Sequence, residues 1–200
     1  VVWDNGSSPA TLAGLPQLFP DVHFAGDAEN WGFAGGNNRG WERIQARYPS
    51  APYLCLLNQD TLVEPGWLRA LVETLERNRR AACAQARLRL EPDRTRINTT
   101  GNRSHYLGFG FTTHAGEVDI GQDGVERPLD FASAAALLVR TDALRALGLF
   151  DDSFFMYLED ADLGWKLRQA GHEVVSSPSS IVYHRYVFKG DFRHYAHLER

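Results

Sequence analysis

Residues 154–165 read Phe-Phe-Met-Tyr-Leu-Glu-Asp-Ala-Asp-Leu-Gly-Trp, which places three carboxylates directly behind an aromatic run. They belong to Glu159, Asp160 and Asp162, at the start of a segment with helical character. Acidic side chains favour the positive N-terminal end of a helix, so the cluster has a purely structural explanation. An aromatic wall beside a carboxylate also raises its basicity, which suits a general base acting on a hydroxyl nucleophile. Taken alone, the cluster favours the structural explanation.

Two further polar elements favour a chemical function. Residues 56–61 read Leu-Leu-Asn-Gln-Asp-Thr, so Asp60 and two amides follow an apolar run of strand length. A divalent cation that shares a diphosphate needs few protein carboxylates, because phosphate oxygens supply the remaining ligands. His184 ends the last expected strand, where it either completes a metal shell or is a partly buried structural histidine. A single Asp at a strand end is ordinarily a turn or cap residue, so neither element is decisive by itself.

The composition is that of one globular domain. The 200 residues include 44% hydrophobic side chains, enough for a core, and carry a net charge of −4. No run of like charge exceeds a few residues, which argues against a nucleic-acid-binding surface. Cys55 and Cys83 lie in apolar strand-like runs and are expected to be reduced core residues. The sequence shows no signal peptide and no bilayer-spanning apolar run, so we expect a soluble, intracellular chain.

Apolar strand-like runs alternate with helical patterns along the first half of the chain. Strands are expected at 1–3, 22–25, 53–57 and 81–90, and helices from Pro9, Phe33 and Pro65. This alternation is typical of a doubly wound α/β sheet, in which 53–57 is a central parallel strand covered on both faces. Residues 91–128 are rich in Gly, Thr, Asn and Arg and are expected to form hairpins and long loops. The remaining expected elements are strands at 131–139, 172–175 and 181–184 and helices at 141–147 and 160–171.

Polar residues follow the expected strands, and ligands on open α/β sheets bind at the carboxyl ends of strands. Asp4 begins the sequence Asp-Asn-Gly-Ser-Ser, which suits either a hydrogen bond to a base or ribose or an Asx turn. Residues 30–40 hold four glycines that lack the Gly-x-Gly-x-x-Gly spacing of a dinucleotide site. These glycines either let the backbone approach a phosphate or nucleobase, or permit a tight strand-to-helix turn. Arg39 either neutralises a diphosphate or lies in solvent.

Five segments occur in a recognisable order. They are Asp-Asn-Gly-Ser-Ser from Asp4, the glycine-rich 30–38, Leu-Leu-Asn-x-Asp-Thr from Leu56, the run 148–165, and Tyr183-His. Together these segments resemble family 2 glycosyltransferases of the GT-A fold, particularly the bacterial rhamnosyltransferase-like branch. The resemblance covers essentially the whole chain. It implies an α/β nucleotide-diphospho-sugar transferase fold, with a mostly parallel central sheet, helices on both faces, and the first strand missing.

The resemblance also implies roles for individual residues. Asp160 would be the catalytic base of an inverting transfer. Asp60 and His184 would hold a divalent cation, Mn or Mg, together with the donor diphosphate. The residues expected to bind the donor nucleotide are Asp4, Asn30, Gly32, Asn38, Asn58 and Asp60. Glu159, Asp162 and Tyr157 would support the helix start and the acceptor, and the aromatic run either stacks on a sugar face or belongs to the core.

The chain departs from the family pattern at several positions. Asn58 replaces the first Asp of the usual metal motif, and Gln59 stands where this branch often has Pro. We therefore expect cation binding to be weak until the donor is present. Ala134 lies where relatives often have Gly, which leaves the geometry on the acceptor side open.

These observations predict a single GT-A domain over 1–200, cut at both ends. The chain opens inside a strand without Met and closes on a helical pattern at 197–200. Residues 1–90 would form the nucleotide-sugar-binding half, and residues 91–200 the acceptor-binding and catalytic half.

The implied function is inverting transfer of a sugar from a nucleotide-diphosphate donor to a glycan or lipid-linked hydroxyl in bacterial surface polysaccharide synthesis. Such an enzyme would act in the cytoplasm, with peripheral association at the inner face of the cell membrane and no nucleic-acid partner. The alternative is a catalytically silent nucleotide- or carbohydrate-binding domain of a larger assembly protein.

Overall fold

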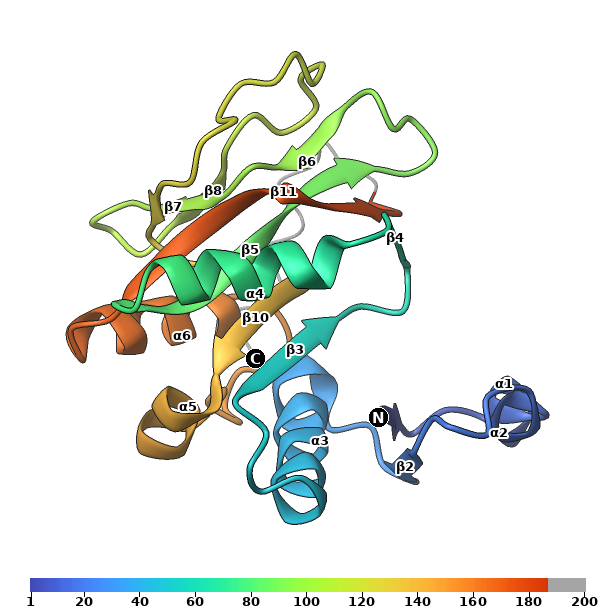
Figure 1. Cartoon of the computed structure of the whole chain (residues 1–200). Helices are drawn as coiled ribbons and strands as arrows, with labels where there is room; N and C mark the ends of the chain where they lie inside the picture. The colour runs from blue at the N-terminus through green and yellow to red at the C-terminus, as the bar shows by residue number, and fades with distance from the viewer. Residues whose placement is uncertain (187–200) are drawn as a thin grey trace.

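The computed structural model describes residues 1–186 and shows a central sheet with helices on both faces (Figure 1). The expected helix at 197–200 lies outside these residues. The order across the main sheet is β3 (Tyr53–Leu57), β10 (Ala136–Arg140), β5 (Ala81–Leu90), β11 (Glu173–His184), β4 (Thr61–Val63). The short strands β6 (Ile97–Thr99) and β9 (Pro128–Leu129) pair with β5 and β11. Two smaller sheets are formed by β1 (Val2–Asn5) with β2 (Phe24–Asp27) and by β7 (Asn102–Ser104) with β8 (Gly110–Thr112).

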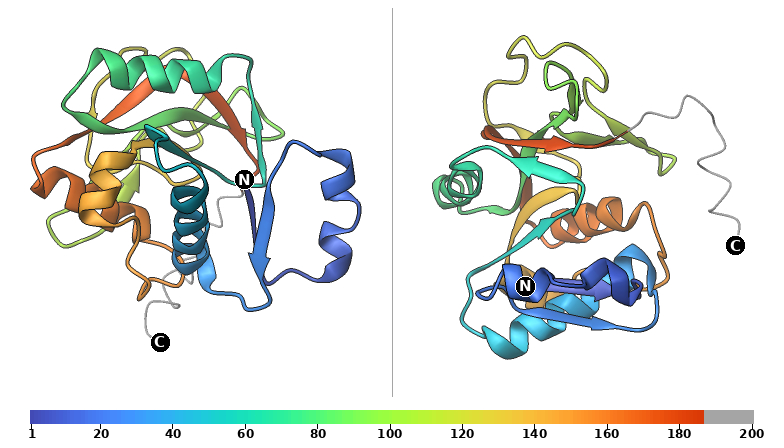
Figure 2. Two further views of the ribbon diagram at one scale, coloured as in Figure 1. Left: turned by 60° about the horizontal axis from the view of Figure 1, so that its bottom comes forward. Right: turned by 90° about the vertical axis from the view of Figure 1, so that its right-hand side faces the viewer.

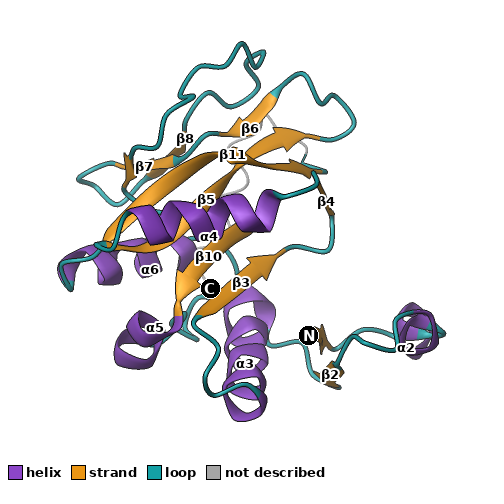
Figure 3. Ribbon diagram, viewed as in Figure 1, coloured by secondary structure: helices purple, strands orange, loops and turns teal. Residues whose placement is uncertain are grey.

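The helices form two layers against this sheet (Figures 2 and 3). On one face α4 (Trp67–Arg77) packs Leu71 and Leu75 against apolar residues of β5, β10 and β11. On the other face lie α3 (Gly32–Arg47), α5 (Thr141–Leu147) and α6 (Glu159–Gln169). The short helices α1 (Pro9–Leu12) and α2 (Leu15–Leu18) follow β1. Among the described residues, no helix is both long and apolar enough to cross a membrane.

Strand β10 connects the two layers because its side chains alternate between them. Leu137 and Val139 face the cluster with α3, α5 and α6, while Leu138 faces the cluster with α4. Its neighbour β5 is likewise buried from Ala81 to Leu88. Strands covered on both faces carry apolar residues without alternation, which explains the continuous apolar runs in the sequence.

The strand register corrects part of the expected sheet. Residues 53–57 form β3, but this strand ends the strand order instead of lying at its centre, and it pairs antiparallel with β10. β10 is also antiparallel to β5, β4 is antiparallel to β11, and β5 and β11 are parallel. The main sheet is therefore mixed. A continuous apolar run indicates that both faces of a strand are covered. It does not indicate how many strands lie beside it or in which direction they run.

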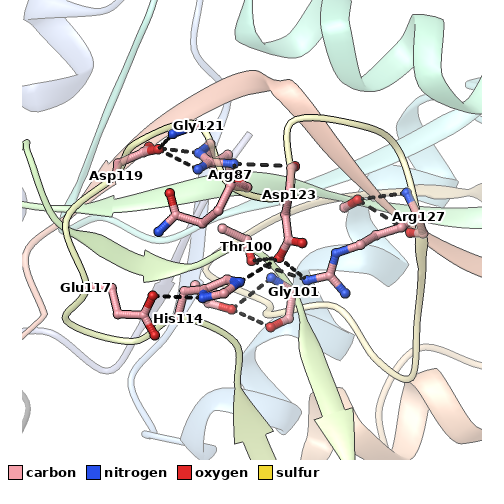
Figure 4. A network of polar contacts seen from close by, with 12 residues as sticks. Arg87, Thr100, Gly101, His114, Glu117, Asp119, Gly121, Asp123 and Arg127 are labelled. Atoms are coloured by element: carbon pink, nitrogen blue, oxygen red, sulfur yellow. Dashed lines mark hydrogen bonds and ion pairs between the residues drawn. The ribbon is translucent and has the colours of Figure 1, made fainter.

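Buried charges attach the irregular segment 91–128 to the sheet (Figure 4). Arg87 of β5 is only 4% exposed and donates to the two carboxylate oxygens of Asp119 at 2.8 and 2.5 Å. Arg89 adds a contact to Asp119 at 2.7 Å. These hydrogen bonds, led by those from Arg87, hold the pKa of the Asp119 carboxyl well below its usual range. A second group centres on Asp123, which accepts from Thr100 and Arg127 at 2.7 Å.

We expect Asp119→Ala to lower the free energy of unfolding by about 3–5 kcal/mol, because Arg87 would remain buried without a counter-charge. The matched control is Glu73→Ala, which removes an exposed pair with Arg77 on α4 and should cost under about 1 kcal/mol. Urea unfolding measures both changes. The pKa of Asp119 is lowered in the folded state, so its stabilisation is present above the ordinary carboxyl pKa and shrinks as the pH falls below it. Equal losses in the two variants would contradict the prediction.

Candidate active site at the carboxyl edge of the sheet

Asp60 and His184 lie together because β4 pairs with the end of β11. Nε2 of His184 is 3.4 Å from Oδ1 of Asp60, and the strand register places His184 opposite Thr61. The backbone N–H of Arg185 donates to the carbonyl of Asp60 at 2.9 Å. Two residues separated by more than a hundred positions are thereby held as neighbours.

The hydrogen bonding of His184 suits a metal ligand. Its Nδ1 lies 2.9 Å from Oδ1 of Asn98, and an amide oxygen only accepts, so Nδ1 carries the proton. Burial lowers the pKa of His184 and favours the neutral ring, whose Nε2 then presents a lone pair toward Asp60. In metal-binding histidines, the ring nitrogen that does not bind the metal usually donates a hydrogen bond to a neighbouring acceptor. No sequence pattern pointed to Asn98 for this role.

Asp60 and His184 therefore fit a divalent cation whose remaining ligands come from a diphosphate. Within residues 1–186, no cluster of three or more His, Cys, Asp or Glu side chains is placed to hold a metal ion.

The acidic cluster begins α6 after a strained turn. Tyr157 and Leu158 have φ angles of 73° and 68°, in the left-handed region that non-glycine residues seldom adopt. Such conformations cost roughly 1–3 kcal/mol each and persist only where surrounding contacts impose them. One such contact is the hydrogen bond from the N–H of Phe33 on α3 to the carbonyl of Phe155, at 2.6 Å.

The three carboxylates of the cluster occupy different environments. Burial raises the pKa of Asp160 to about 6, although backbone N–H groups of Ala161 and Ala134 hydrogen-bond to it. Burial, followed by the charge of Asp160, raises the pKa of Glu159 to about 7. Oε2 of Glu159 has no hydrogen-bond partner among the described residues. Asp162 instead pairs with Lys166 one helical turn later, at 3.1 Å.

The segment before β10 connects the Asp60 turn to Asp160. The N–H of Asn58 donates to the carbonyl of Ala135 at 3.0 Å, and the N–H of Ala134 bonds to Asp160. The hydroxyl of Thr61 donates to the carbonyl of Asn58 at 2.6 Å and shapes the turn that carries Asp60. Ala134 contributes a backbone group, so this support does not depend on the glycine that relatives often have there.

Asp4 takes part in an Asx turn and lines a hollow. Its Oδ1 accepts a hydrogen bond from the N–H of Ser7 at 3.1 Å. The open hollow has a volume of about 420 Å³, and its lining includes Asp4, Ser7, Ser8, Phe24 and Asp27. The turn and a ligand contact are compatible, because only one carboxylate oxygen is engaged in the turn.

Asn5, which the sequence did not single out, organises the adjacent segment. Its Nδ2 donates to Oδ1 of Asn30 at 3.0 Å and to the carbonyl of Gly32 at 2.7 Å. Its Oδ1 accepts from the N–H of Trp31 at 3.1 Å. Asn30 and Gly32 are therefore both tied to β1. The signal available in the sequence was the position of Asn5 directly after Asp4.

The glycine-rich stretch is helical from Gly32, one residue before the helix start expected at Phe33. A Cβ at Gly36 would lie 2.8 Å from the side chain of Asn5, and one at Gly32 only 2.3 Å from the carbonyl oxygen of Phe155. Here the glycines allow α3 to pack closely on β1 and on the turn before α6. Gly32, with φ of 71° at the start of α3, also agrees with the expected tight strand-to-helix turn, and the approach of a phosphate or nucleobase stays a prediction.

Two further residues of α3 also make structural contacts. Asn38 exchanges hydrogen bonds with the backbone of Phe150 at 2.9 and 3.0 Å and donates to Asp152 at 2.7 Å. These bonds fix the segment that leads into the acidic cluster. Arg39 stacks on Trp31, with its guanidinium carbon 3.6 Å from the ring centroid.

We expect Gly32→Ala to disturb the turn before Asp160 in two ways. The added Cβ strains the positive-φ backbone of residue 32, and it also collides with the carbonyl oxygen of Phe155. Gly14→Ala is the matched control, because Gly14 also has positive φ (82° against 71°) but has open space around its Cβ position. Both changes should lower the melting temperature through backbone strain. Only Gly32→Ala should also move Phe155, which amide NMR of residues 155–160 can follow. Equal effects of the two variants would show that the contact with Phe155 has no role.

Comparisons with known proteins relate the chain to one family. The family model described as "Glycosyl transferase family 2" matches residues 1–147. The N-acetylglucosaminyl-diphospho-decaprenol L-rhamnosyltransferases of two Mycobacterium tuberculosis strains are 29% identical over 198 residues, covering 90% of this chain. The chain spans 64% of the length of these curated relatives.

Solved structures of glycosyltransferases share the fold. GalNAc-T7 with UDP, GalNAc and Mn2+ has a TM-score of 0.70 at 14% identity, over 94% of this chain and 38% of that chain. The mannosyltransferase PcManGT from Pyrobaculum calidifontis, in complex with GDP-Man and Mn2+, has a TM-score of 0.63 at 13% identity, over 94% and 48%. The expected GT-A fold and the resemblance to rhamnosyltransferases are confirmed.

Proposed function

Because the chain belongs to glycosyl transferase family 2, we propose that it is the transferase domain of an inverting enzyme that uses a nucleotide-diphosphate sugar. The acceptor is a hydroxyl of a glycan or lipid-linked saccharide, and the context is bacterial surface polysaccharide synthesis. The single observation that carries the proposal is the position of Asp160 at the start of α6, where Ala134 and Ala135 connect it through backbone hydrogen bonds to the turn that carries Asp60. The identity to enzymes named for a decaprenol-linked substrate supports the acceptor class.

Asp160 is suited to the proton transfer because its pKa is raised to about 6. It is therefore ionised at neutral pH and more basic than an ordinary carboxylate. In the proposed step Asp160 takes the proton of the acceptor hydroxyl as that oxygen bonds to the anomeric carbon. The bond from this carbon to the donor diphosphate breaks at the same time, which inverts the configuration. The fixed turn at Tyr157–Leu158 positions the base before the substrate arrives.

Asp60 and His184 are the residues proposed to hold a divalent cation, Mn or Mg. When bound, such a cation neutralises charge on the departing diphosphate. Asp4, Asn30 and Asn58 are proposed to line the donor side. Gly32 and Asn38 serve it indirectly, by holding α3 against β1 and the segment 150–152.

The proposed halves 1–90 and 91–200 are interleaved, because β10 from the second half lies between β3 and β5 from the first. Donor and acceptor sides would then be connected through one sheet. We propose that the enzyme acts in the cytoplasm, with peripheral association at the inner membrane face.

A second candidate is a silent nucleotide- or carbohydrate-binding domain, favoured by Asn58 in place of the usual first Asp of the metal motif. Both an enzyme and a silent nucleotide-binding domain would bind the donor. Only an enzyme would release nucleoside diphosphate when the acceptor is added. A screen of nucleotide sugars by thermal shift, with and without manganese, followed by a transfer assay on the full-length protein, separates the two.

We expect Asp160→Asn to lower kcat by about 10²–10⁴-fold with donor affinity nearly unchanged, because the variant keeps the side-chain shape but not the proton acceptor. In the wild type, activity should fall as the pH drops below about 6, since protonation removes the base. Asp162→Asn is the matched control, and should change kcat little because Asp162 pairs with Lys166. Near-native turnover of Asp160→Asn, with loss in Glu159→Gln, would reassign the base to Glu159.

We expect manganese binding to the wild type to be weak alone and at least about tenfold tighter with a nucleoside diphosphate, whose oxygens supply ligands. Asp60→Ala should abolish this gain, while Glu64→Ala, on the same connection but bonded to Tyr183, should retain it. Isothermal titration calorimetry measures both. Tight cation binding without nucleotide that is unchanged in Asp60→Ala would remove Asp60 from the site.

A further inference from the structure

The hairpin formed by β7 and β8 carries an exposed aromatic tip. Tyr106 is 88% exposed, the highest value among the large apolar side chains of the described residues. Leu107, Phe109 and Phe111 are each more than half exposed. Four such side chains within six residues form an exposed apolar patch. Contact of such a patch with water is unfavourable, and exposed apolar patches typically mark sites that bind a partner or a membrane.

The tip has a defined shape. The N–H of His105 donates to the carbonyl of Phe109 at 2.7 Å, and Gly108 donates back to His105 at 2.9 Å. The ring of His105 lies 4.1 Å from that of Tyr106 and 6.3 Å from those of Phe109 and Phe111. The aromatic side chains are therefore presented by a closed turn in which the rings pack against one another.

The tip itself carries no acidic side chain, and the carboxylate bonded to the hairpin is that of Asp130, which accepts a hydrogen bond from the backbone N–H of Ser104 at its base. Residues 94–116 include three Arg and two His but no Asp or Glu, in a chain of net charge −4. Arg94 and Arg96 pair with Glu91 and Asp93, which leaves Arg103 as the exposed cation nearest the tip. An aromatic, acid-free tip with a neighbouring Arg has the composition that favours the interface of an anionic bilayer over a protein surface of mixed charge.

The hairpin is also connected to the proposed acceptor side. The N–H of Ser104 donates to Asp130 at 2.8 Å, and Asp130 lies 3.4 Å from Arg168 of α6. Phe131 contacts both elements: a Cβ at Gly110 of the hairpin would lie 2.9 Å from its ring, and a Cβ at Gly164 of α6 would lie 2.4 Å from its Cβ. Gly164 is one helical turn, about 6 Å along the axis, from Asp160.

From these observations, and resting on the proposed function, we propose that residues 103–111 insert into the surface of an anionic lipid bilayer. Docking there would hold the enzyme at the membrane. The lipid carrier of the acceptor could then stay in the bilayer while the sugar on it reaches Asp160. The occupant is the bilayer itself.

Vesicle flotation of the full-length protein tests the proposal. The probe is vesicles of phosphatidylcholine with phosphatidylglycerol, compared with phosphatidylcholine alone. We expect the combined change Tyr106→Ser, Leu107→Ser and Phe109→Ser to weaken vesicle binding by at least about tenfold. The matched control is Leu18→Ser with Phe19→Ser, two comparably exposed apolar residues at the end of α2, a helix that lies far from the β7–β8 hairpin (Figure 1), and this variant should bind as the wild type. Arg103→Gln should weaken only the binding that depends on phosphatidylglycerol.

A transfer assay supplies the second readout. The hairpin variant should lose transfer to a lipid-linked acceptor in vesicles while keeping transfer to a short, water-soluble analogue. Wild-type protein that does not float with vesicles, or a hairpin variant that floats normally, would overturn the inference and leave the proposed function standing. Absent transfer to either acceptor, with vesicle binding intact, would instead overturn the proposed function. A variant that changes only the sedimentation coefficient would show that a second copy of the chain covers the tip, and would also overturn the inference.

Discussion

The antiparallel pairing of β10 between β3 and β5 is the constraint on which the rest of the structure depends. It aligns Ala136 with Leu57 and thereby places the preceding residues, Ala134 and Ala135, between the Asn58 turn and the start of α6. One of these backbone groups bonds to Asn58 and the other to Asp160. If β10 were shifted by one residue, both hydrogen bonds would be lost and the apolar side chains of β10 would exchange faces.

A second consequence of this packing is electrostatic. The start of α6 lies against the sheet, so Glu159 and Asp160 lose solvent, and the pKa of both rises. In the folded state a raised carboxyl pKa is unfavourable once the pH exceeds the unfolded-state value. At neutral pH the raised pKa values of this helix start therefore lower the free energy of unfolding, and they make the carboxylate more basic. The left-handed backbone at Tyr157 and Leu158 adds to that cost at the same place. Concentration of strain and burial in one turn is typical of functional sites.

Much of the fold and of the candidate site was predictable from local pattern. The boundaries of β5 were predicted as observed because a strand-like segment rich in small and apolar residues, although it includes Gln85, Arg87 and Arg89, is a local property. Both cysteines are free, as their apolar surroundings indicated, and burial raises the pKa of both thiols. The position of β3 at the end of the strand order was not predictable, because strand neighbours are chosen by residues far away in sequence. For the same reason the structural roles of Asn5 and Asn98 were not predicted. The role of an amide side chain depends on its hydrogen-bond partners, which only the folded structure shows.

The sequence by itself determined the family, the helix-and-strand alternation and the residue types that carry the chemistry, because motifs and periodicity are encoded within short windows. Only the tertiary structure decided that Asp60 faces His184, that Asn38 and Gly32 hold elements together, and that Glu159 is buried while Asp162 is paired. These outcomes depend on contacts between segments up to more than a hundred residues apart. Burial and pairing are properties of the packed chain, and no short stretch of sequence specifies them.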